Sequence, residues 1–222
     1  MAAISVFDVI GPNMIGPSSS HTAGAAAIAL LTRKLMDGKL VSAVFTLYGS
    51  FAETYRGHGT DKALLGGTLG FSTDDIRIRN SMLIAEEEGL HYEFIINHSE
   101  KTAHPNTVDI ELQNDQGRVL KVRGESLGGG KVHLSKINQI EVDFTGEYTS
   151  LIVSHTDYPG VLAYITKCLS EHQVNIAFMK LYRVAKGDKA YAIVETDEKI
   201  NQNIIDEIAE NQYVKRTMLV QV

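Results

Sequence analysis

The residues best suited to chemistry form one polar run that directly precedes the apolar segment 25–31. Hydroxyl side chains of this kind cap helices, because their oxygens accept hydrogen bonds from the free N–H groups of the first turn, and a helix N-terminus attracts anions. A cap needs only one such residue, so the run indicates a site for a carboxylate or phosphate with a titratable imidazole beside it. A serine-rich turn that only caps a helix is the alternative. The run comprises Ser18, Ser19, Ser20, His21 and Thr22.

A second segment, residues 57–61, repeats this mixture of polar and flexible residues. Glycines on both sides of His58 permit close approach of the backbone. Gly59 is followed by Thr60 and Asp61, either of which we expect to cap the next helix. Taken by itself, this segment is more simply a capped loop.

The third segment is His104-Pro105-Asn106. Pro105 biases the preceding residue toward an extended backbone, which would fix the direction of the His104 imidazole. Three histidine motifs also suggest a mononuclear metal site, but none has the helical i, i+4 spacing or the adjacent carboxylates that such sites use. We therefore assign no metal ligand to this chain.

Composition excludes several classes of partner. The 222 residues include 21 Lys and Arg against 27 Asp and Glu, which gives a net charge of −6. Nucleic acids and anionic membranes bind clustered positive charge, so neither is an expected partner. No apolar stretch approaches the roughly 20 residues of a membrane span, and the first residues lack the pattern of a signal peptide. We expect a cytoplasmic protein.

The chain has one cysteine, Cys168, within an apolar helical pattern. A single thiol excludes an internal disulfide. It also excludes a cysteine-ligated zinc or an iron–sulfur cluster held by this chain alone, because such sites need about four thiolates. We expect Cys168 to be buried and without a catalytic role.

Strands and helices alternate over residues 1–146, which we predict to form one domain of mixed α/β structure. Hydrophobic periodicity and turn residues define the elements, and the segment 145–147 marks the boundary. Helices are expected over 22–36, 60–69 and 80–88, and strands over 41–51, 91–98, 107–112, 118–123, 131–137 and 139–144.

Residues 147–222 predict a second domain with the order βαββαβ, which is the ferredoxin-like arrangement. Its strands are expected over 150–155, 176–184, 190–195 and 214–222, and its helices over 161–171 and 201–210. A small sheet of this kind has helices on one face, and its edge strands often pair with another copy, so homodimerisation is expected. The whole chain is therefore predicted to be an α+β protein with two domains.

With these elements in place, the polar segments become recognisable. The run 15–24 resembles the signature of the iron–sulfur-dependent bacterial L-serine dehydratases, and residues 57–63 and 104–107 resemble two further motifs of that family. The N-terminal domain is similar to the allosteric substrate-binding domains of other serine-metabolising enzymes. The tail resembles an ACT domain, a small module that binds amino acids at its dimer interface. The combination resembles the beta subunit of the two-subunit form of the enzyme.

The resemblance implies a lyase that converts L-serine to pyruvate and ammonia without pyridoxal phosphate. It implies that a separate alpha subunit carries a 4Fe–4S cluster, one iron of which binds the β-hydroxyl of serine. The active site would be shared, with the serine run binding the α-carboxylate and His21 donating a hydrogen bond or acting as general acid–base. The residues implied for this site are Ser18, Ser19, Ser20, His21, Thr22, His58, Gly59, Thr60, Asp61, His104 and Asn106.

The ACT-like tail is implied to bind a small amino acid or a monovalent cation between two protomers. The alternative is that this domain only dimerises, because small sheets readily pair through their edges. The candidate contacts are His155, Asp157, Pro159, Gly160 and Asn175.

Two other functions fit the sequence. The chain would be a purely regulatory amino-acid-binding subunit if all chemistry lay on the partner, or a free-standing sensor if there were no partner. A regulatory pocket needs serine and asparagine hydrogen-bonding groups but gives no reason for three histidine motifs. This difference favours catalytic participation.

Overall fold

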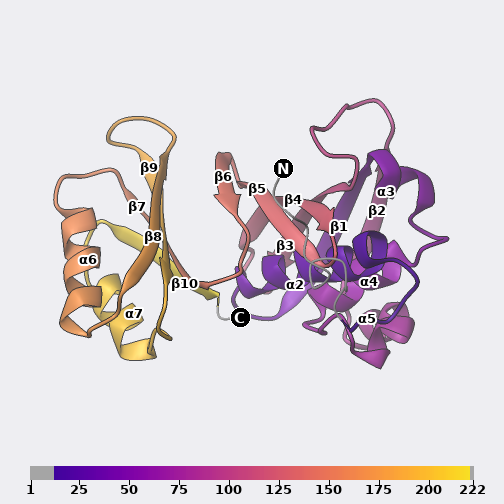
Figure 1. The fold of residues 1–222 in the computed structure, drawn as a ribbon, viewed down its shortest axis with the longest axis horizontal. Coiled ribbons are helices and arrows are strands. Elements are labelled where there is room, and N and C mark those ends of the chain that lie inside the picture. The colour runs from indigo at the N-terminus through magenta and orange to yellow at the C-terminus, as the bar shows by residue number, and fades with distance from the viewer. Residues whose placement is uncertain (1–12, 221–222) are drawn as a thin grey trace, which may run out of the picture. The chain divides into compact units, whose positions relative to one another are not determined.

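The computed structural model describes residues 13–220, which form two compact units with a boundary within residues 139–145 (Figure 1). Each unit packs helices against a β-sheet, so the predicted α+β class is confirmed. Within residues 13–220, every helix is too short or too polar to cross a membrane.

The first unit contains a six-stranded sheet in the order β2-β1-β3-β4-β5-β6. Strands β1 and β2 are parallel, while β1 with β3, β3 with β4 and β4 with β5 are antiparallel. The elements are η1 (Ser19–Ala23), α2 (Gly24–Lys34), β1 (Leu40–Tyr48), α3 (Gly49–Thr54), α4 (Thr60–Thr68), η2 (Ile76–Asn80), α5 (Ser81–Glu87), β2 (His91–Asn97), β3 (Thr107–Asn114), β4 (Val119–Gly128), β5 (Lys131–Ile137) and β6 (Ile140–Phe144).

The core of this unit lies on the sheet face that helices α2 and α4 cover. Alternate residues of the central strands point into it, among them Phe45 and Leu47 on β1 and Ile110 on β3. The two helices approach closely at Gly67, where a Cβ would lie 2.2 Å from the Ala26 carbonyl oxygen. Only glycine fits there, and the tight contact holds α2 and the preceding turn η1 in a fixed place.

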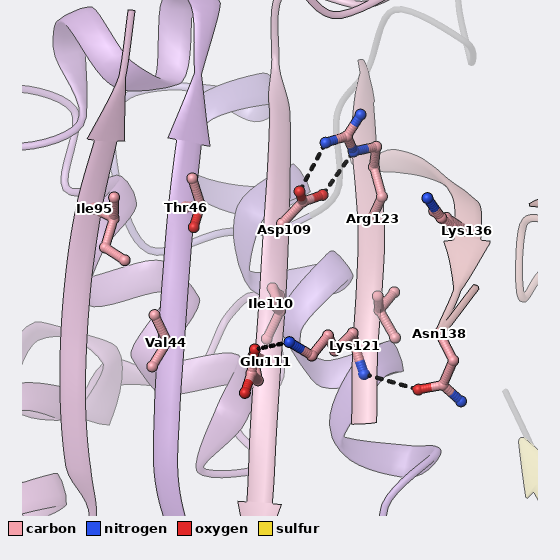
Figure 2. Close-up of a pocket in the computed structure, with 11 residues that line it drawn as sticks. Val44, Thr46, Ile95, Asp109, Ile110, Glu111, Lys121, Arg123, Lys136 and Asn138 are labelled. Carbon is pink, nitrogen blue, oxygen red and sulfur yellow. Dashed lines mark hydrogen bonds and ion pairs between the residues drawn. The ribbon is translucent and has the colours of Figure 1, made fainter. Parts of the chain in front are cut away.

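The other face of the same sheet has charged side chains. Asp109 on β3 stands opposite Arg123 on β4, and Glu111 stands opposite Lys121. The two pairs form ion pairs with N–O distances of 2.7 and 2.6 Å. Together with Val44 and neighbouring residues they line an open cleft of about 300 Å³ (Figure 2). This face is therefore a polar surface and not a second core.

One sequence prediction about this unit is wrong in a way that affects the site. The strand predicted over 41–51 ends at Tyr48, because Gly49 has a φ of +50° and starts the short helix α3. A Cβ on Gly49 would lie 2.5 Å from the Pro105 carbonyl oxygen, so a side chain has no room there. Phe51 is buried in α3, and its apolar side chain made the segment resemble a continuing strand.

The second unit contains a four-stranded antiparallel sheet in the order β10-β7-β9-β8, with the predicted βαββαβ succession of elements. Its helices pack on one face of the sheet around a core that includes Val153, Ile165 and Ile208. Strands β8 and β10 are the edges. The elements are β7 (Thr149–Thr156), α6 (Val161–Glu171), β8 (Ile176–Arg183), β9 (Lys189–Thr196), α7 (Gln202–Ala209) and β10 (Val214–Val220).

Candidate functional site

The first motif folds as a single π-helical turn, η1, that continues into α2. Ser18 is its N-cap, and the Ser18 Oγ accepts a hydrogen bond from the His21 N–H at 3.1 Å. The Ser20 Oγ lies 3.0 Å from Nδ1 of His21. The helical turns begin at Ser19, earlier than the predicted Thr22. Single π turns are rare and occur often at functional sites, and this one places the imidazole beside two serine hydroxyls.

His21 lies among residues from a later segment. Its Nε2 is 2.9 Å from the Ser50 Oγ, and its ring centroid is 4.8 Å from that of His58 and 5.4 Å from that of Phe51. Partial burial, and after it the charge of His58, lower the pKa of His21 below 6.5. The imidazole is therefore neutral at pH 7, and each of its nitrogens faces a serine hydroxyl.

The second motif is joined to the first by Thr22, whose Oγ1 donates a hydrogen bond to the His58 carbonyl oxygen at 3.0 Å. Helix α4 begins after Gly59, which has a φ of +68°. Thr60 and Asp61 do not occupy the N-cap position, which is Gly59, but the Asp61 carboxylate accepts a hydrogen bond from the Lys62 N–H in the first turn at 2.8 Å. Burial raises the pKa of the Asp61 carboxyl.

The third motif reaches the same place from the loop 98–106. The Asn106 N–H donates to Nδ1 of His104 at 3.2 Å, which fixes the imidazole against its own loop. The Pro105 carbonyl oxygen accepts a hydrogen bond from the Ser50 N–H at 2.8 Å. Because the Ser50 side chain also contacts His21, the third motif and the first meet at the start of α3.

A serine on β4 adds a second link between these motifs. The Ser126 N–H donates to the Asn106 carbonyl oxygen and the Ser126 Oγ donates to the Ser20 carbonyl oxygen, both at 2.9 Å. Gly24 is required beside it, because a Cβ there would lie 1.9 Å from the Ser126 Oγ. Neither Ser50 nor Ser126 could be predicted from the sequence. They lie 29 and 106 residues from their partners, and no local pattern marks them.

The second and third motifs also contain unsatisfied polar atoms. His58 Nδ1, Thr60 Oγ1 and Asn106 Oδ1 are buried, and none has a hydrogen-bond partner within the described part of the chain. Buried polar atoms in proteins are nearly always paired, so unpaired ones mark places where water or a ligand binds. Three such atoms on the second and third motifs, which both contact the first, indicate a binding site.

The donors of this chain do not fit a metal cluster. Cys168 is buried, as predicted, and burial raises the pKa of its thiol to about 11. Over residues 13–220, the His, Cys, Asp and Glu side chains form no group of three or more that could hold a metal ion. A cluster that needs several thiolates therefore has no place on the described residues.

In the second unit, the candidate residues at the end of β7 are close together. His155 is buried, and its Nδ1 donates to the Thr156 carbonyl oxygen at 2.8 Å. Its Nε2 is buried and has no hydrogen-bond partner among residues 13–220. Asp157 accepts hydrogen bonds from the Gly187 N–H at 3.2 Å and from Arg183 at 3.1 Å, and these contacts lower its pKa.

The other candidates of this unit lie at two ends of one helix. Pro159 is exposed, and Gly160, with a φ of +92°, begins α6. Asn175 follows the opposite end of α6, where its side chain donates to Asp197 at 2.6 Å. The 11 residues of α6 span about 16 Å. The structure therefore does not bring Asn175 to the other candidates within one chain.

Comparison with known proteins gives consistent matches. The family described as "Serine dehydratase beta chain" matches residues 5–89. The probable L-serine dehydratase beta chain of Bacillus subtilis is 41% identical over 92% of both chains, and the L-serine dehydratase beta chain of Peptoniphilus asaccharolyticus is 37% identical over the same shares. An L-serine dehydratase of Streptomyces coelicolor is 42% identical over 36% of this chain and 18% of its own length.

Proposed function

This chain belongs to the serine dehydratase beta-chain family, and on that premise we propose that it supplies part of an L-serine dehydratase active site completed by an alpha subunit. The observation that carries the proposal is the convergence of three polar motifs, with unpaired buried atoms, in one unit. A purely regulatory pocket would have no need of a pair of imidazoles whose ring centroids are 4.8 Å apart.

The reaction sets two tasks that these residues suit. Loss of water from serine requires removal of the proton on Cα and departure of the β-hydroxyl. The aminoacrylate product then tautomerises to an imine and hydrolyses to pyruvate and ammonia. The neutral imidazole of His21 has one lone pair, which faces a serine hydroxyl. We propose that the substrate displaces this hydrogen bond and that the freed nitrogen takes the Cα proton, and a base of this kind contributes about 10²–10⁴ in rate.

The substrate would be held by groups around this imidazole. We propose that the α-carboxylate binds the hydroxyls and backbone N–H groups of Ser18, Ser19 and Ser20, where the start of η1 and α2 favours negative charge. The unpaired Asn106 Oδ1 is an acceptor and suits the ammonium group of serine. Thr60 and Asp61 follow His58 in the chain and are the first residues of α4.

The 4Fe–4S cluster that the family resemblance implies does not fit the donors of this chain, and we propose that it belongs to the alpha subunit. Support for a partner comes from the names of the two full-length relatives, which designate each as a beta chain. The longer Streptomyces protein, of which this chain matches a small part, is consistent with a site that needs residues from outside this chain. The expected cytoplasmic location stays a prediction.

For the second unit we propose an ACT-type role, in which two copies pair and bind a small amino acid between them. Support comes from the βαββαβ fold and from His155, whose buried Nε2 lacks a partner beside Asp157. A second copy would bring its Asn175 to this place. Dimerisation without a ligand is the alternative, and calorimetry with L-serine distinguishes the two.

Reconstitution tests the proposed function. L-serine turnover to pyruvate is measured for this chain, for the cluster-bearing alpha subunit, and for the two together. We expect turnover only when both are present. Full turnover by the alpha subunit by itself would favour the purely regulatory function, and turnover by this chain by itself would contradict the shared site.

A further inference from the structure

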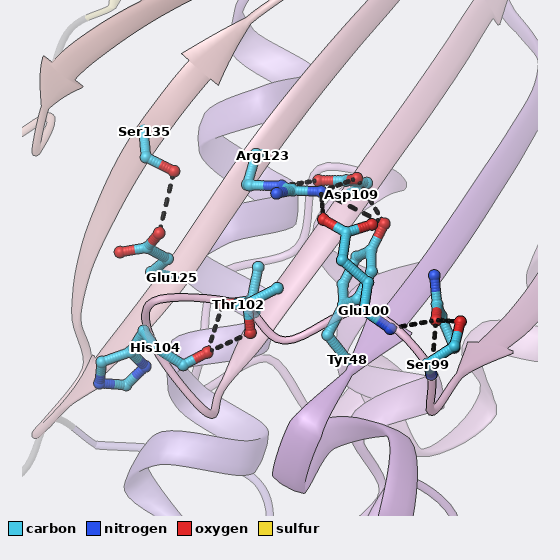
Figure 3. Close-up of polar contacts among 11 residues, drawn as sticks. Tyr48, Ser99, Glu100, Thr102, His104, Asp109, Arg123, Glu125 and Ser135 are labelled. Atoms are coloured by element: carbon cyan, nitrogen blue, oxygen red, sulfur yellow. Dashed lines mark hydrogen bonds and ion pairs between the residues drawn. The ribbon is translucent and has the colours of Figure 1, made fainter.

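A network of four polar side chains lies on the sheet face opposite the helices, next to the loop that carries the third motif (Figure 3). At its centre is Arg123 on β4. Its Nε and Nη2 both contact the Asp109 carboxylate on β3, each at 2.7 Å. A bidentate pair of this kind fixes the plane of the guanidinium group, and with it the direction of the remaining N–H groups.

The same guanidinium holds two further side chains. The Tyr48 hydroxyl accepts a hydrogen bond from Nη2 of Arg123 at 3.3 Å and donates to Asp109 at 2.8 Å. Burial, and after it the hydrogen bond to Asp109, raise the pKa of Tyr48 to about 12, so the phenol stays a donor. The Glu100 carboxylate lies 3.1 Å from the same Nη2. Arg123 therefore joins the end of β1 to the loop 98–106.

These two attachments lie directly upstream of the candidate site. Tyr48 is followed in the chain by Gly49 and Ser50, and Ser50 contacts His21 through its side chain and Pro105 through its N–H. Glu100 lies in the loop that continues to His104 and Asn106. The close approach of Gly49 and Pro105 leaves little room for adjustment. The position of the loop over the end of β1 therefore depends on what holds its first half.

We propose that Arg123 and Glu100 are positioning residues, which hold the loop 98–106 so that Asn106 and the Ser50–His21 contact are correctly placed. This inference rests on the proposed function, in which these groups face the substrate. Neither Arg123 nor Glu100 touches the substrate in this scheme. Their effect is geometric, and a displacement of about 1 Å at a reacting group can reduce the rate roughly 100-fold.

The chain offers a matched control on the same two strands. Glu111 and Lys121 form an ion pair at 2.6 Å on the same face, two positions along from Asp109 and Arg123. Glu111 and Glu100 are similarly exposed, at 43% and 47% of their side-chain surface. The Glu111 pair makes no contact with the loop, so Glu111→Gln removes an equivalent ion pair and leaves the loop attached.

The test compares Glu100→Gln with Glu111→Gln in two measurements. The first is hydrogen exchange of the Ser50 and Ser126 amides in the full chain, because both amides bond to loop carbonyls. The second is kcat/KM for L-serine in the enzyme assembled with its alpha subunit. We expect Glu100→Gln to speed exchange about tenfold and to lower kcat/KM about tenfold, with Glu111→Gln changing neither.

Arg123→Met should lower kcat/KM for L-serine more than Glu100→Gln does. Arg123→Lys should lower it less than Arg123→Met, because lysine keeps the charge but not the bidentate geometry. Glu100 is exposed, so its substitution keeps the test available if Arg123→Met does not fold. Equal exchange in the two glutamine variants, or faster exchange with unchanged kcat/KM, would overturn the proposal. If the assembled wild-type enzyme shows no turnover, the proposed function fails, while exchange still decides whether the loop is held in this way.

Discussion

The two units of this chain arrange their polar residues in different ways. In the first unit, residues far apart in sequence meet within one chain, and Thr22, Ser50 and Ser126 provide the direct links. In the second unit, Asp157 and Asn175 lie at opposite ends of α6, about 16 Å in length. The first set of residues is connected within one copy, whereas one copy leaves Asp157 and Asn175 apart, and the proposed pairing of two copies would bring them together.

The difference has a practical consequence for assembly. A cluster that is linked by its own hydrogen bonds is placed when the unit folds, and a partner needs only to dock on it. Residues at opposite ends of a helix are not brought together when the unit folds. A ligand bound between two copies would therefore couple its own binding to dimerisation. This contrast supports the proposal that the first unit takes part in catalysis and the second binds a ligand between two copies.

The largest expected effect tests the first arrangement. His21→Ala should reduce kcat of the assembled enzyme by about 10²–10⁴, because the group proposed to take the Cα proton is lost. His91→Ala is the control, since His91 is exposed at the start of β2. Steady-state pyruvate formation measures both, and equal turnover in the two variants would rule out a catalytic His21.

The next effect concerns the packing that holds the first motif. Gly24→Ala should destabilise the chain by about 1–3 kcal/mol, because the new methyl group meets Ser126. Gly57→Ala is the control, as its Cβ would lie 3.7 Å from the nearest atom. Urea denaturation measures both. Adding Ser126→Gly should recover part of the loss, and no recovery would mean that the clash lies elsewhere.

A mixing experiment compares the two units directly. Asp157→Ala and Asn175→Ala should each weaken binding of L-serine to the second unit at least tenfold. In an equal mixture of these two variants, about a quarter of the binding sites should return. Half of the dimers then contain one chain of each variant, and one of the two sites in such a dimer has both Asp157 and Asn175. A mixture of His21→Ala and Asn106→Ala chains should restore no turnover, since both residues serve the same site in one chain. Calorimetry measures the return of L-serine binding, and activity assays measure the restored turnover. Restored turnover without restored binding would contradict the comparison of the two units.

The smallest effect is on pH dependence. Because burial and His58 lower the pKa of His21, the neutral form persists below pH 6.5, and the acid limb of kcat/KM lies under that value. The preference of the folded state for neutral His21 also contributes to the free energy of unfolding. This contribution is present above pH 6.5 and is lost as the pH falls through the pKa of His21 in the folded state. His58→Gln removes the repulsion and should move the acid limb to higher pH. An unchanged or lower limb would show that another group controls it.

The sequence predicted most of the fold because its signals are local. Periodicity and turn residues located the strands of both units, and the βαββαβ order followed from them. The strand that begins near residue 41 was predicted, but its end at Tyr48 was missed because Phe51 continues an apolar pattern, and only the contact of Gly49 with Pro105 reveals the turn. The motif residues stood out by composition, but Ser50 and Ser126 act through tertiary contacts that no local pattern records.

The most direct test of the central claim is a structure of the assembled enzyme with L-serine bound to the His21→Ala variant, which should not turn it over. We expect the serine carboxylate within about 3 Å of the Ser18–Ser20 groups, and its ammonium group beside Asn106. Serine bound far from all three motifs, on residues of the alpha subunit only, would contradict it.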